Sequence, residues 1–245
     1  MKKSYIIIGV VVVVMLAAIG IYAVINSNSQ SKKQLEENST NIEGTTNTEN
    51  STKENNTENK DEYIQNNQIS NESEENNMYS TGKHHAEIVV KNYGTIALEL
   101  DADVAPITVE NFANLVNEGF YNGLTFHRII SGFMIQGGDP LGNGTGGSSK
   151  TIKGEFASNG VKNSISHVRG TISMARSSMP NSASSQFFIV HQDSTFLDGK
   201  YAAFGTVTSG MEVVDKICAD TAVEDDNGTV AKNNQPVIEK ITMID

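Results

Sequence analysis

The sequence predicts a mainly β fold, an antiparallel barrel or sandwich with two helices. Short runs rich in Val, Ile, Phe and Thr recur along the C-terminal two thirds of the chain, and turns containing glycine or asparagine separate them. Only two stretches show the apolar spacing of three and four residues that is typical of an amphipathic helix. Many short strands with few helices favour a barrel or a sandwich, and roughly 160 residues are ample for one hydrophobic core.

The predicted domain begins with a hairpin and continues into the first helix. Residues 86–90 and 95–100 alternate apolar and polar side chains on either side of a turn at residues 92–94. Pro106 suits the first turn of a helix, and Gly119 is a typical helix end. The apolar stripe of this helix consists of Val109, Phe112, Ala113, Leu115 and Val116.

Six further strands and a second helix complete the predicted domain. The strands are expected at residues 124–130, 133–137, 170–175, 186–190, 203–207 and 237–244, and the helix at residues 211–218. Together with the hairpin, this makes eight expected strands.

The first residues predict a membrane anchor. Residues 5–25 contain no charged side chain and are dominated by Val, Ile and Ala, which suffices to cross a bilayer that needs about 20 apolar residues. A signal peptide has a shorter apolar core of about 7 to 15 residues. We therefore expect residues 1–25 to contain an uncleaved transmembrane helix. Secretion after signal cleavage is the alternative. Lys2 and Lys3 favour a cytoplasmic start, although two lysines after the segment weaken the charge asymmetry.

Residues 26–82 are predicted to be a disordered linker, and residues 83–245 the folded domain. The linker is rich in Asn, Ser, Thr, Glu and Gln and has few aliphatic side chains, too few to offset the entropy cost of ordering. As a flexible coil of about 5 to 6 Å times the square root of its length, it would span roughly 40 Å and hold the domain clear of a membrane surface.

Composition and spacing exclude several classes of function. From Ala86 to Asp245 the chain has 11 Lys and Arg against 18 Asp and Glu, a net charge of −7, which argues against a nucleic-acid partner or an anionic lipid surface. The single cysteine, Cys218, permits no intramolecular disulfide and is interpreted as a small buried helix residue. The histidines lack metal-ligand spacing, so no metal is expected. Residues 142–147 match a dinucleotide-binding glycine pattern, but no helical pattern follows them.

Residues 126–140 are the passage most informative about function. They place a guanidinium, a primary amide, an aromatic ring and a thioether along two short extended pieces joined by a glycine, which a core strand does not need. Arg128 stands out because the chain uses Lys nearly everywhere, and a planar guanidinium is not interchangeable with an ammonium. Taken alone, Arg128 could equally form a surface salt bridge. Its neighbour His127 is interpreted as a hydrogen-bonded packing residue.

This passage resembles the central motif of the cyclophilin family of peptidyl-prolyl cis-trans isomerases. Residues 185–189, Ser-Gln-Phe-Phe-Ile, resemble the second hallmark of that family. The similarity spans about residues 86–244. It implies a closed eight-stranded antiparallel barrel capped by two α-helices, and prolyl isomerase activity that needs no metal or cofactor.

The resemblance also implies roles for individual residues. Arg128 and Gln136 are the catalytic candidates: the guanidinium would lie against the proline carbonyl and nitrogen, and the amide would hold substrate backbone and orient Arg128. The substrate-binding candidates are Phe133, Met134, Ala175, Gln186, Phe188, Phe196, Leu197 and Tyr201. Taken alone, the apolar candidates would be interpreted as barrel core. Many family members carry Trp in place of Phe196, His in place of Tyr201, and a shorter Asn-containing loop in place of residues 176–179.

We therefore expect a single-pass membrane protein whose isomerase domain faces outward and accelerates rotation about X-Pro bonds while exported proteins fold. Its partners would be proline-containing segments of exported proteins, and we expect a monomer. Two alternatives stay open: a non-catalytic chaperone module that binds proline peptides on the same fold, and a surface adhesin in which the length of the linker is the function.

Overall fold

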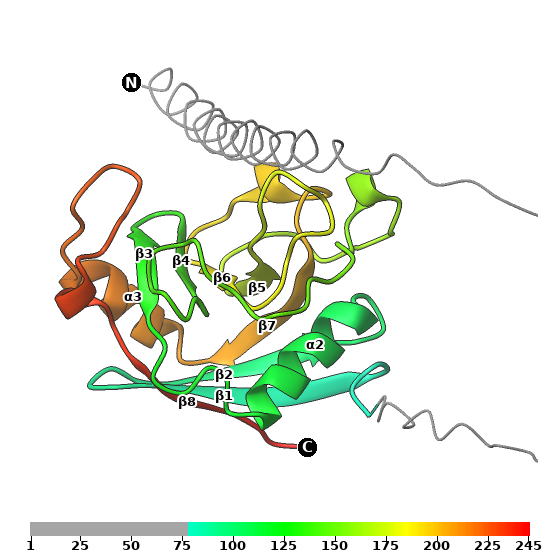
Figure 1. Cartoon of the computed structure of the whole chain (residues 1–245), viewed down its shortest axis with the longest axis horizontal. Helices are drawn as coiled ribbons and strands as arrows, with labels where there is room; N and C mark the ends of the chain where they lie inside the picture. The colour runs from blue at the N-terminus through cyan, green and yellow to red at the C-terminus, as the bar shows by residue number, and fades with distance from the viewer. Residues whose placement is uncertain (1–77) are drawn as a thin grey trace, which may run out of the picture. The chain divides into compact units, whose positions relative to one another are not determined.

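The computed structural model describes residues 78–245, in which eight strands form one curled antiparallel sheet with two helices (Figure 1). The strand order is β3-β4-β6-β5-β7-β2-β1-β8. The strands are β1 (Lys83–Val90), β2 (Gly94–Asp101), β3 (Phe126–Ile130), β4 (Met134–Gly137), β5 (Thr171–Met174), β6 (Phe187–Val190), β7 (Ala203–Ser209) and β8 (Ile238–Met243). The helices are α2 (Pro106–Asn117) and α3 (Met211–Asp220), and the short 3-10 helices are η1 (Ala157–Asn159), η2 (Thr195–Leu197) and η3 (Lys232–Asn234). The structure confirms all eight predicted strands and both predicted helices.

The predicted membrane anchor and most of the predicted linker lie outside the described residues. Between residues 78 and 245, no helix combines the length and the apolar character that crossing a membrane requires. Tyr79 is buried in the main core, and its hydroxyl accepts a hydrogen bond from Nδ2 of Asn117 at 3.3 Å. The last residues before β1 thus pack against the domain.

The strands β1 and β2 form the predicted hairpin. Lys83 pairs with Asp101 at one end of the ladder, and Val90 pairs with Gly94 at the turn. Asn92 adopts a φ of 65° there, a left-handed conformation that Asn tolerates better than most residues. The alternation of both strands places every second side chain in the main core: Ala86, Ile88 and Val90 from β1, and Ile96, Leu98 and Leu100 from β2.

The sheet is not the closed barrel that the resemblance implied. Its two outer strands, β3 and β8, are joined by a single bridge between Thr125 and Val237. The ladder cannot extend past Pro236, because proline has no N–H to donate. The rest of the outer edge of β3 bonds instead to the loop at residues 228–230. The result is an open, curled sheet, or half-barrel.

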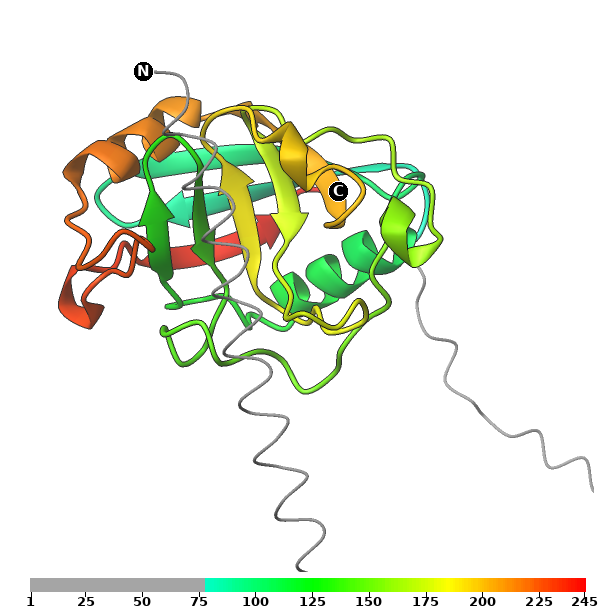
Figure 2. The same ribbon diagram turned by 90° about the horizontal axis from the view of Figure 1, so that it is seen from above.

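The two helices lie at opposite ends of the curled sheet (Figure 2). Helix α2 buries all five apolar positions predicted from the sequence, Val109, Phe112, Ala113, Leu115 and Val116. Phe112 packs against Tyr121, Phe187 and Phe204 with ring centroids 5.2 to 5.7 Å apart. Such aromatic contacts favour edge-to-face and tilted geometry, and they connect the helix to the core of the sheet.

The N-terminus of α2 is capped by a distant side chain. Ala105 precedes the helix and offers no side-chain cap. The buried carboxylate of Glu155 accepts hydrogen bonds from the N–H of Ile107 at 3.1 Å, and from the N–H and Oγ1 of Thr108 at 2.8 and 2.6 Å. A carboxylate satisfies free N–H groups at a helix start and interacts favourably with the helix dipole. The loop that carries Glu155 is therefore connected directly to α2.

Candidate active site

The alternation of β4 and β6 places two sets of side chains on opposite faces of the sheet. Ile135, Phe187 and Ile189 point into the main core. Met134 and Phe188 belong to a second, separate apolar cluster. Because successive side chains of a strand point to opposite faces, neighbouring residues of β4 and β6 alternate between the main core and this second cluster.

This second cluster, which we call the outer cluster, gathers most of the apolar residues proposed for substrate binding. It consists of buried Met134, Phe188, Val190 and Leu197, with partly buried Ile130, Phe133, Ala175 and Tyr201 packed against it. Phe196 is 54% exposed and lies beside the cluster, with its ring 5.6 Å from that of Phe133. A group of apolar side chains outside the main core, with an exposed aromatic ring at its edge, is a candidate binding surface.

The polar candidates form a hydrogen-bonded chain beside the outer cluster. Arg128 on β3 and Gln136 on β4 are directly opposite in the ladder, and Nη1 of Arg128 donates to Oε1 of Gln136 at 3.2 Å. Nε2 of Gln136 donates to Oε1 of Gln186 at 2.9 Å. Nε2 of Gln186 in turn donates to the carbonyls of Gly144 and Gly146 at 3.1 and 2.7 Å. The chain orients both amides and the guanidinium.

Asn227 is a second partner of Arg128, and we did not predict it. Nε of Arg128 donates to the carbonyl of Asn227 at 2.8 Å, and Nη2 donates to its Oδ1 at 3.2 Å. Burial lowers the pKa of Arg128, but an arginine starts so high that it stays cationic at neutral pH. The neighbouring Gly228 has a φ of 81°, and a Cβ there would lie 2.4 Å from the carbonyl of Ile129. The Asn-Gly pair at residues 227–228 was the available sequence signal, since it is typical of a tight turn.

The glycine-rich loop at residues 142–147 is built around a buried carboxylate. Asp139 accepts hydrogen bonds from the N–H groups of Leu141 at 2.8 Å, Asn143 at 3.0 Å and Gly144 at 2.6 Å. Burial raises the pKa of Asp139, but these N–H groups outweigh burial and lower it overall. The loop is therefore a turn that presents carbonyl oxygens to the polar chain.

Arg176 lies on the loop that follows β5. Its Nε and Nη2 donate to the carbonyl of Lys200 at 3.1 and 2.8 Å, and its Nη1 donates to the carbonyls of Ser177 and Ser178 at 2.9 and 3.3 Å. Its guanidinium also lies over the ring of Tyr201, 4.8 Å from the centroid. The side chain therefore braces its own loop against one residue of the outer cluster.

The sequence also indicates that His127 and Cys218 are packing residues. His127 is buried as expected, but neither ring nitrogen has a hydrogen-bond partner within residues 78–245, so the expected hydrogen bond is wrong. The bulge between Phe126 and Arg128 displaces His127 from the regular pairing.

Cys218 is partly buried against the main core, and burial raises the pKa of its thiol to about 11. Among the described residues, no group of three His, Cys, Asp or Glu side chains could hold a metal ion.

The chain is similar to several known peptidyl-prolyl cis-trans isomerases. A crystal structure of a Cryptosporidium parvum cyclophilin type peptidyl-prolyl cis-trans isomerase, determined in the presence of the dipeptide Ala-Pro, matches with a TM-score of 0.58 and 31% identity. The match covers 66% of this chain and 99% of that one. A peptidyl-prolyl cis-trans isomerase of Helicobacter pylori is 51% identical over 128 residues, which are 51% of this chain and 76% of the relative. Peptidyl-prolyl cis-trans isomerase B of Bacillus subtilis is 50% identical over 117 residues, 48% of this chain and 78% of the relative.

The fold and these relatives define an enzyme of the prolyl isomerase class. The family model described as "Cyclophilin type peptidyl-prolyl cis-trans isomerase/CLD" matches residues 85–243. The chain belongs to this family.

Proposed function

We propose that Arg128 stabilises the twisted X-Pro bond of a peptide whose proline ring lies on the outer cluster. Rotation about this bond has a barrier of about 18 to 20 kcal/mol, because the nitrogen shares its lone pair with the carbonyl. In the twisted state that sharing is lost and the nitrogen becomes a hydrogen-bond acceptor. A fixed cationic donor favours that state over the planar one, which is how binding becomes catalysis.

The observation that carries this proposal is the way the guanidinium of Arg128 is held. Gln136 and Asn227 bind it on two sides, at 3.2 Å from Nη1 and 2.8 Å from Nε. A donor held in advance loses little entropy when charge develops on the substrate. Lowering the barrier by about 8 kcal/mol would speed rotation about a millionfold. The chemistry needs no nucleophile, metal or cofactor.

The remaining candidates would bind the peptide. Gln136 would hold substrate backbone, and Gln186 would orient Gln136 through its 2.9 Å hydrogen bond. The proposed substrate-binding set is Phe133, Met134, Ala175, Gln186, Phe188, Phe196, Leu197 and Tyr201. Burial of Met134, Phe188 and Leu197 supports their use as the floor of the proline site, whereas exposed Phe196 suits a flanking residue of the peptide.

Arg128→Ala in the 245-residue chain tests the catalytic role. We expect kcat/KM for an Ala-Ala-Pro-Phe peptide to fall about 100- to 1,000-fold, as for the loss of one electrostatic donor. Arg128→Lys keeps the charge but loses the planar fork, so its activity should stay well below that of the wild type. Wild-type activity in Arg128→Ala would refute the assigned role. Peptide binding without turnover by the wild type would instead favour the non-catalytic chaperone module.

The proposed site of action is the outer face of the cytoplasmic membrane, where the domain would assist exported proteins as a monomer. The uncharged residues 5–25 and the polar linker at residues 26–82 support tethering. Protease treatment of intact cells should release an active domain if the chain is tethered and faces outward. Activity that resists the protease until the cells are lysed would place the domain inside, and activity already in the medium would favour secretion.

A further inference from the structure

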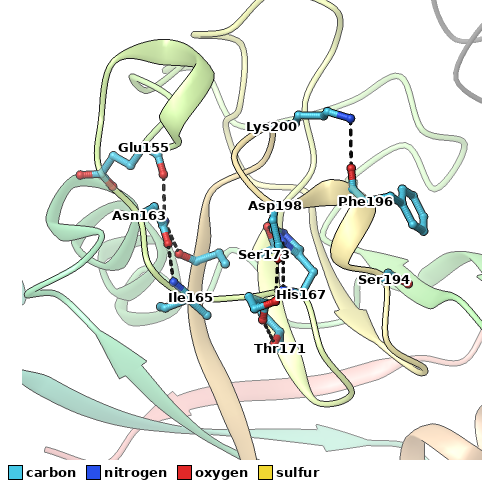
Figure 3. Close-up of polar contacts among 12 residues, drawn as sticks. Glu155, Asn163, Ile165, His167, Thr171, Ser173, Ser194, Phe196, Asp198 and Lys200 are labelled. Carbon is cyan, nitrogen blue, oxygen red and sulfur yellow. Dashed lines mark hydrogen bonds and ion pairs between the residues drawn. The ribbon is translucent and has the colours of Figure 1, made fainter.

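A buried histidine and an aspartate at the surface form a hydrogen-bonded pair beside the outer cluster (Figure 3). His167 is 1% exposed and lies on the loop before β5. Its Nδ1 donates to Oδ1 of Asp198 at 2.8 Å, and its backbone N–H donates to the same oxygen at 2.7 Å. Oδ2 of Asp198 accepts from Oγ of Ser166 at 2.6 Å. One carboxylate therefore receives three hydrogen bonds from two consecutive residues.

The other nitrogen of His167 bonds to strand β5, and the face of its ring contacts Phe188 in the floor of the proposed proline site. Nε2 accepts a hydrogen bond from Oγ of Ser173 at 3.0 Å. This assignment follows from the carboxylate of Asp198, which can only accept and so requires the proton on Nδ1. The imidazole stacks on the ring of Phe188 with the centroids 6.0 Å apart and the planes at 18°. Burial lowers the pKa of His167, which agrees with a neutral ring.

Asp198 directly follows η2, the short helix that contributes Leu197 to the outer cluster. Leu197 is buried in the cluster, and Phe196 packs its ring against Phe133 at 5.6 Å. Both are among the residues proposed to bind substrate. The position of η2 therefore determines where two of these side chains lie.

Within the described part of the chain, every hydrogen bond from residues 194–198 to another element runs to His167 or to the serine before it. Before η2, the N–H of Ser194 donates to the carbonyl of His167 at 2.7 Å. After η2, Asp198 accepts the three bonds described above. The remaining bonds are local, such as that from the N–H of Leu197 to the carbonyl of Ser194 at 3.0 Å. The loop at His167 thus holds η2 at both ends.

We propose that His167 and Asp198 are positioning residues for prolyl isomerisation. The pair holds η2, which carries Phe196 and Leu197, while the imidazole stacks on the ring of Phe188. Neither residue needs to touch the substrate. The inference rests on the proposed function, because it assumes that the peptide binds at the outer cluster.

Two substitutions of His167 separate the two contacts. His167→Phe keeps an aromatic ring beside Phe188 but removes the side-chain hydrogen bonds to Asp198 and Ser173. His167→Asn keeps a donor where Nδ1–H was but removes the ring. We expect each to raise KM for an Ala-Ala-Pro-Phe peptide about 10-fold with a smaller change in kcat, because the contacts that they disturb act on bound substrate in its ground state and transition state alike. Amide hydrogen exchange at residues 194–198 should accelerate in His167→Phe and stay near wild type in His167→Asn.

Asp198 offers a second variant pair, at a position where the side chain is 38% exposed. Asp198→Asn retains an Oδ1 that can accept both bonds from His167, and its amide can donate to Oγ of Ser166. Asp198→Ala retains none of these bonds. We expect KM near the wild-type value for the asparagine and a KM raised about 10-fold for the alanine, with exchange at residues 194–198 accelerated only in the alanine variant.

Thr171→Val is the matched control. Oγ1 of this buried threonine donates to the carbonyl of Ser166 at 2.8 Å, so the variant removes one hydrogen bond from the same loop without touching η2. We expect it to lower thermal stability while leaving KM unchanged.

The proposal is overturned if His167→Phe and Asp198→Ala lose stability as the control does but keep the wild-type KM, since the pair would then only stabilise the fold. It is also overturned if residues 194–198 exchange at the wild-type rate in Asp198→Ala. A wild-type chain without isomerase activity would refute the proposed function instead. The peptide Kd, measured in place of KM, and the exchange rates would then still decide whether the pair positions the outer cluster.

Discussion

The guanidinium of Arg176 lies over the ring of Tyr201, 4.8 Å from the centroid, and Tyr201 meets Phe188 edge-to-face at 6.0 Å. The same guanidinium also lies over the ring of the buried Phe156, 4.9 Å from its centroid. One arginine thus connects an aromatic ring of the main core to two aromatic rings of the outer cluster. Its hydrogen-bonding groups bind carbonyls of its own loop and of Lys200, so we assign it a bracing role.

Arg176→Met should therefore loosen Tyr201 without touching Arg128. The variant keeps an apolar stem but loses two cation–π contacts and several hydrogen bonds, which together are worth about 1 to 3 kcal/mol. We expect the free energy of unfolding to fall by about that amount and kcat/KM to fall several-fold. Arg176→Lys should recover little, because an ammonium cannot bind three carbonyls in a plane. Full recovery by lysine would show that only the charge matters. Denaturant titration and isomerase kinetics measure both effects.

Asn227→Ala should lower catalysis more than binding. The substitution removes the 3.2 Å bond from Nη2 of Arg128 while the backbone carbonyl can still accept from Nε. The guanidinium would then be held less firmly on one side. We expect kcat to fall about 10-fold and KM to change little, because the donor acts mainly in the transition state. Asp226→Asn changes the adjacent residue, which makes no hydrogen bond to Arg128, and should behave like the wild type. Equal losses in both variants would contradict a specific role for Asn227.

Stability should fall as the pH drops below about 6.5, partly through His127. The ring nitrogens of His127 have no hydrogen-bond partner in the described part of the chain. Burial lowers the pKa of this imidazole, and Arg128 lowers it further, while Asp139 has the opposite effect. A histidine whose folded pKa lies below its unfolded value of about 6.5 contributes full stability above that pH and loses it on acidification. Burial lowers the pKa of His167 as well, so it acts in the same direction.

His127→Phe should flatten this pH dependence without abolishing it, since His167 remains. The measurement is the free energy of unfolding at intervals between pH 8 and pH 5. The carboxylates with lowered pKa, such as Asp139, lose their contribution only at lower pH, below about 4, so the two windows separate. An unchanged slope between pH 7 and pH 5 in His127→Phe would exclude His127 as a source.

Glu155→Gln should destabilise the domain and leave the kinetics alone. The carboxylate of Glu155 accepts from the N–H groups of both Ile107 and Thr108, but an amide has only one oxygen. In the variant, the NH₂ group would therefore face one of these two N–H groups. A lost buried, charge-assisted hydrogen bond costs about 1.5 to 3 kcal/mol. Glu118→Gln, at the exposed C-terminus of the same helix, should change stability by less than about 0.5 kcal/mol. A comparable loss in both variants would mean that the helix cap is not responsible.

Periodicity predicted the local structure well because it depends on neighbours in the sequence. Burial of every second residue sets the alternation along β4 and β6, and burial of every third or fourth residue sets the apolar stripe of α2. The structure confirms these elements. The resemblance to the cyclophilin family supplied six of the eight residues of the outer cluster, all but Ile130 and Val190, which alternation alone could not separate from core. It also implied a closed barrel, which is wrong here because Pro236 interrupts the ladder between the outer strands.

The sequence by itself determined which segments are strands and helices, which side chains share a face, and the family to which the chain belongs. Only the tertiary structure decided the partners that hold those side chains: Asn227 for Arg128, Glu155 for α2, and the pair of His167 and Asp198 for η2. The physical reason is that these contacts join residues 31 to 99 positions apart. Polar partners at such separations leave no periodic trace in the sequence, and the path of the folded chain alone brings them within hydrogen-bonding distance.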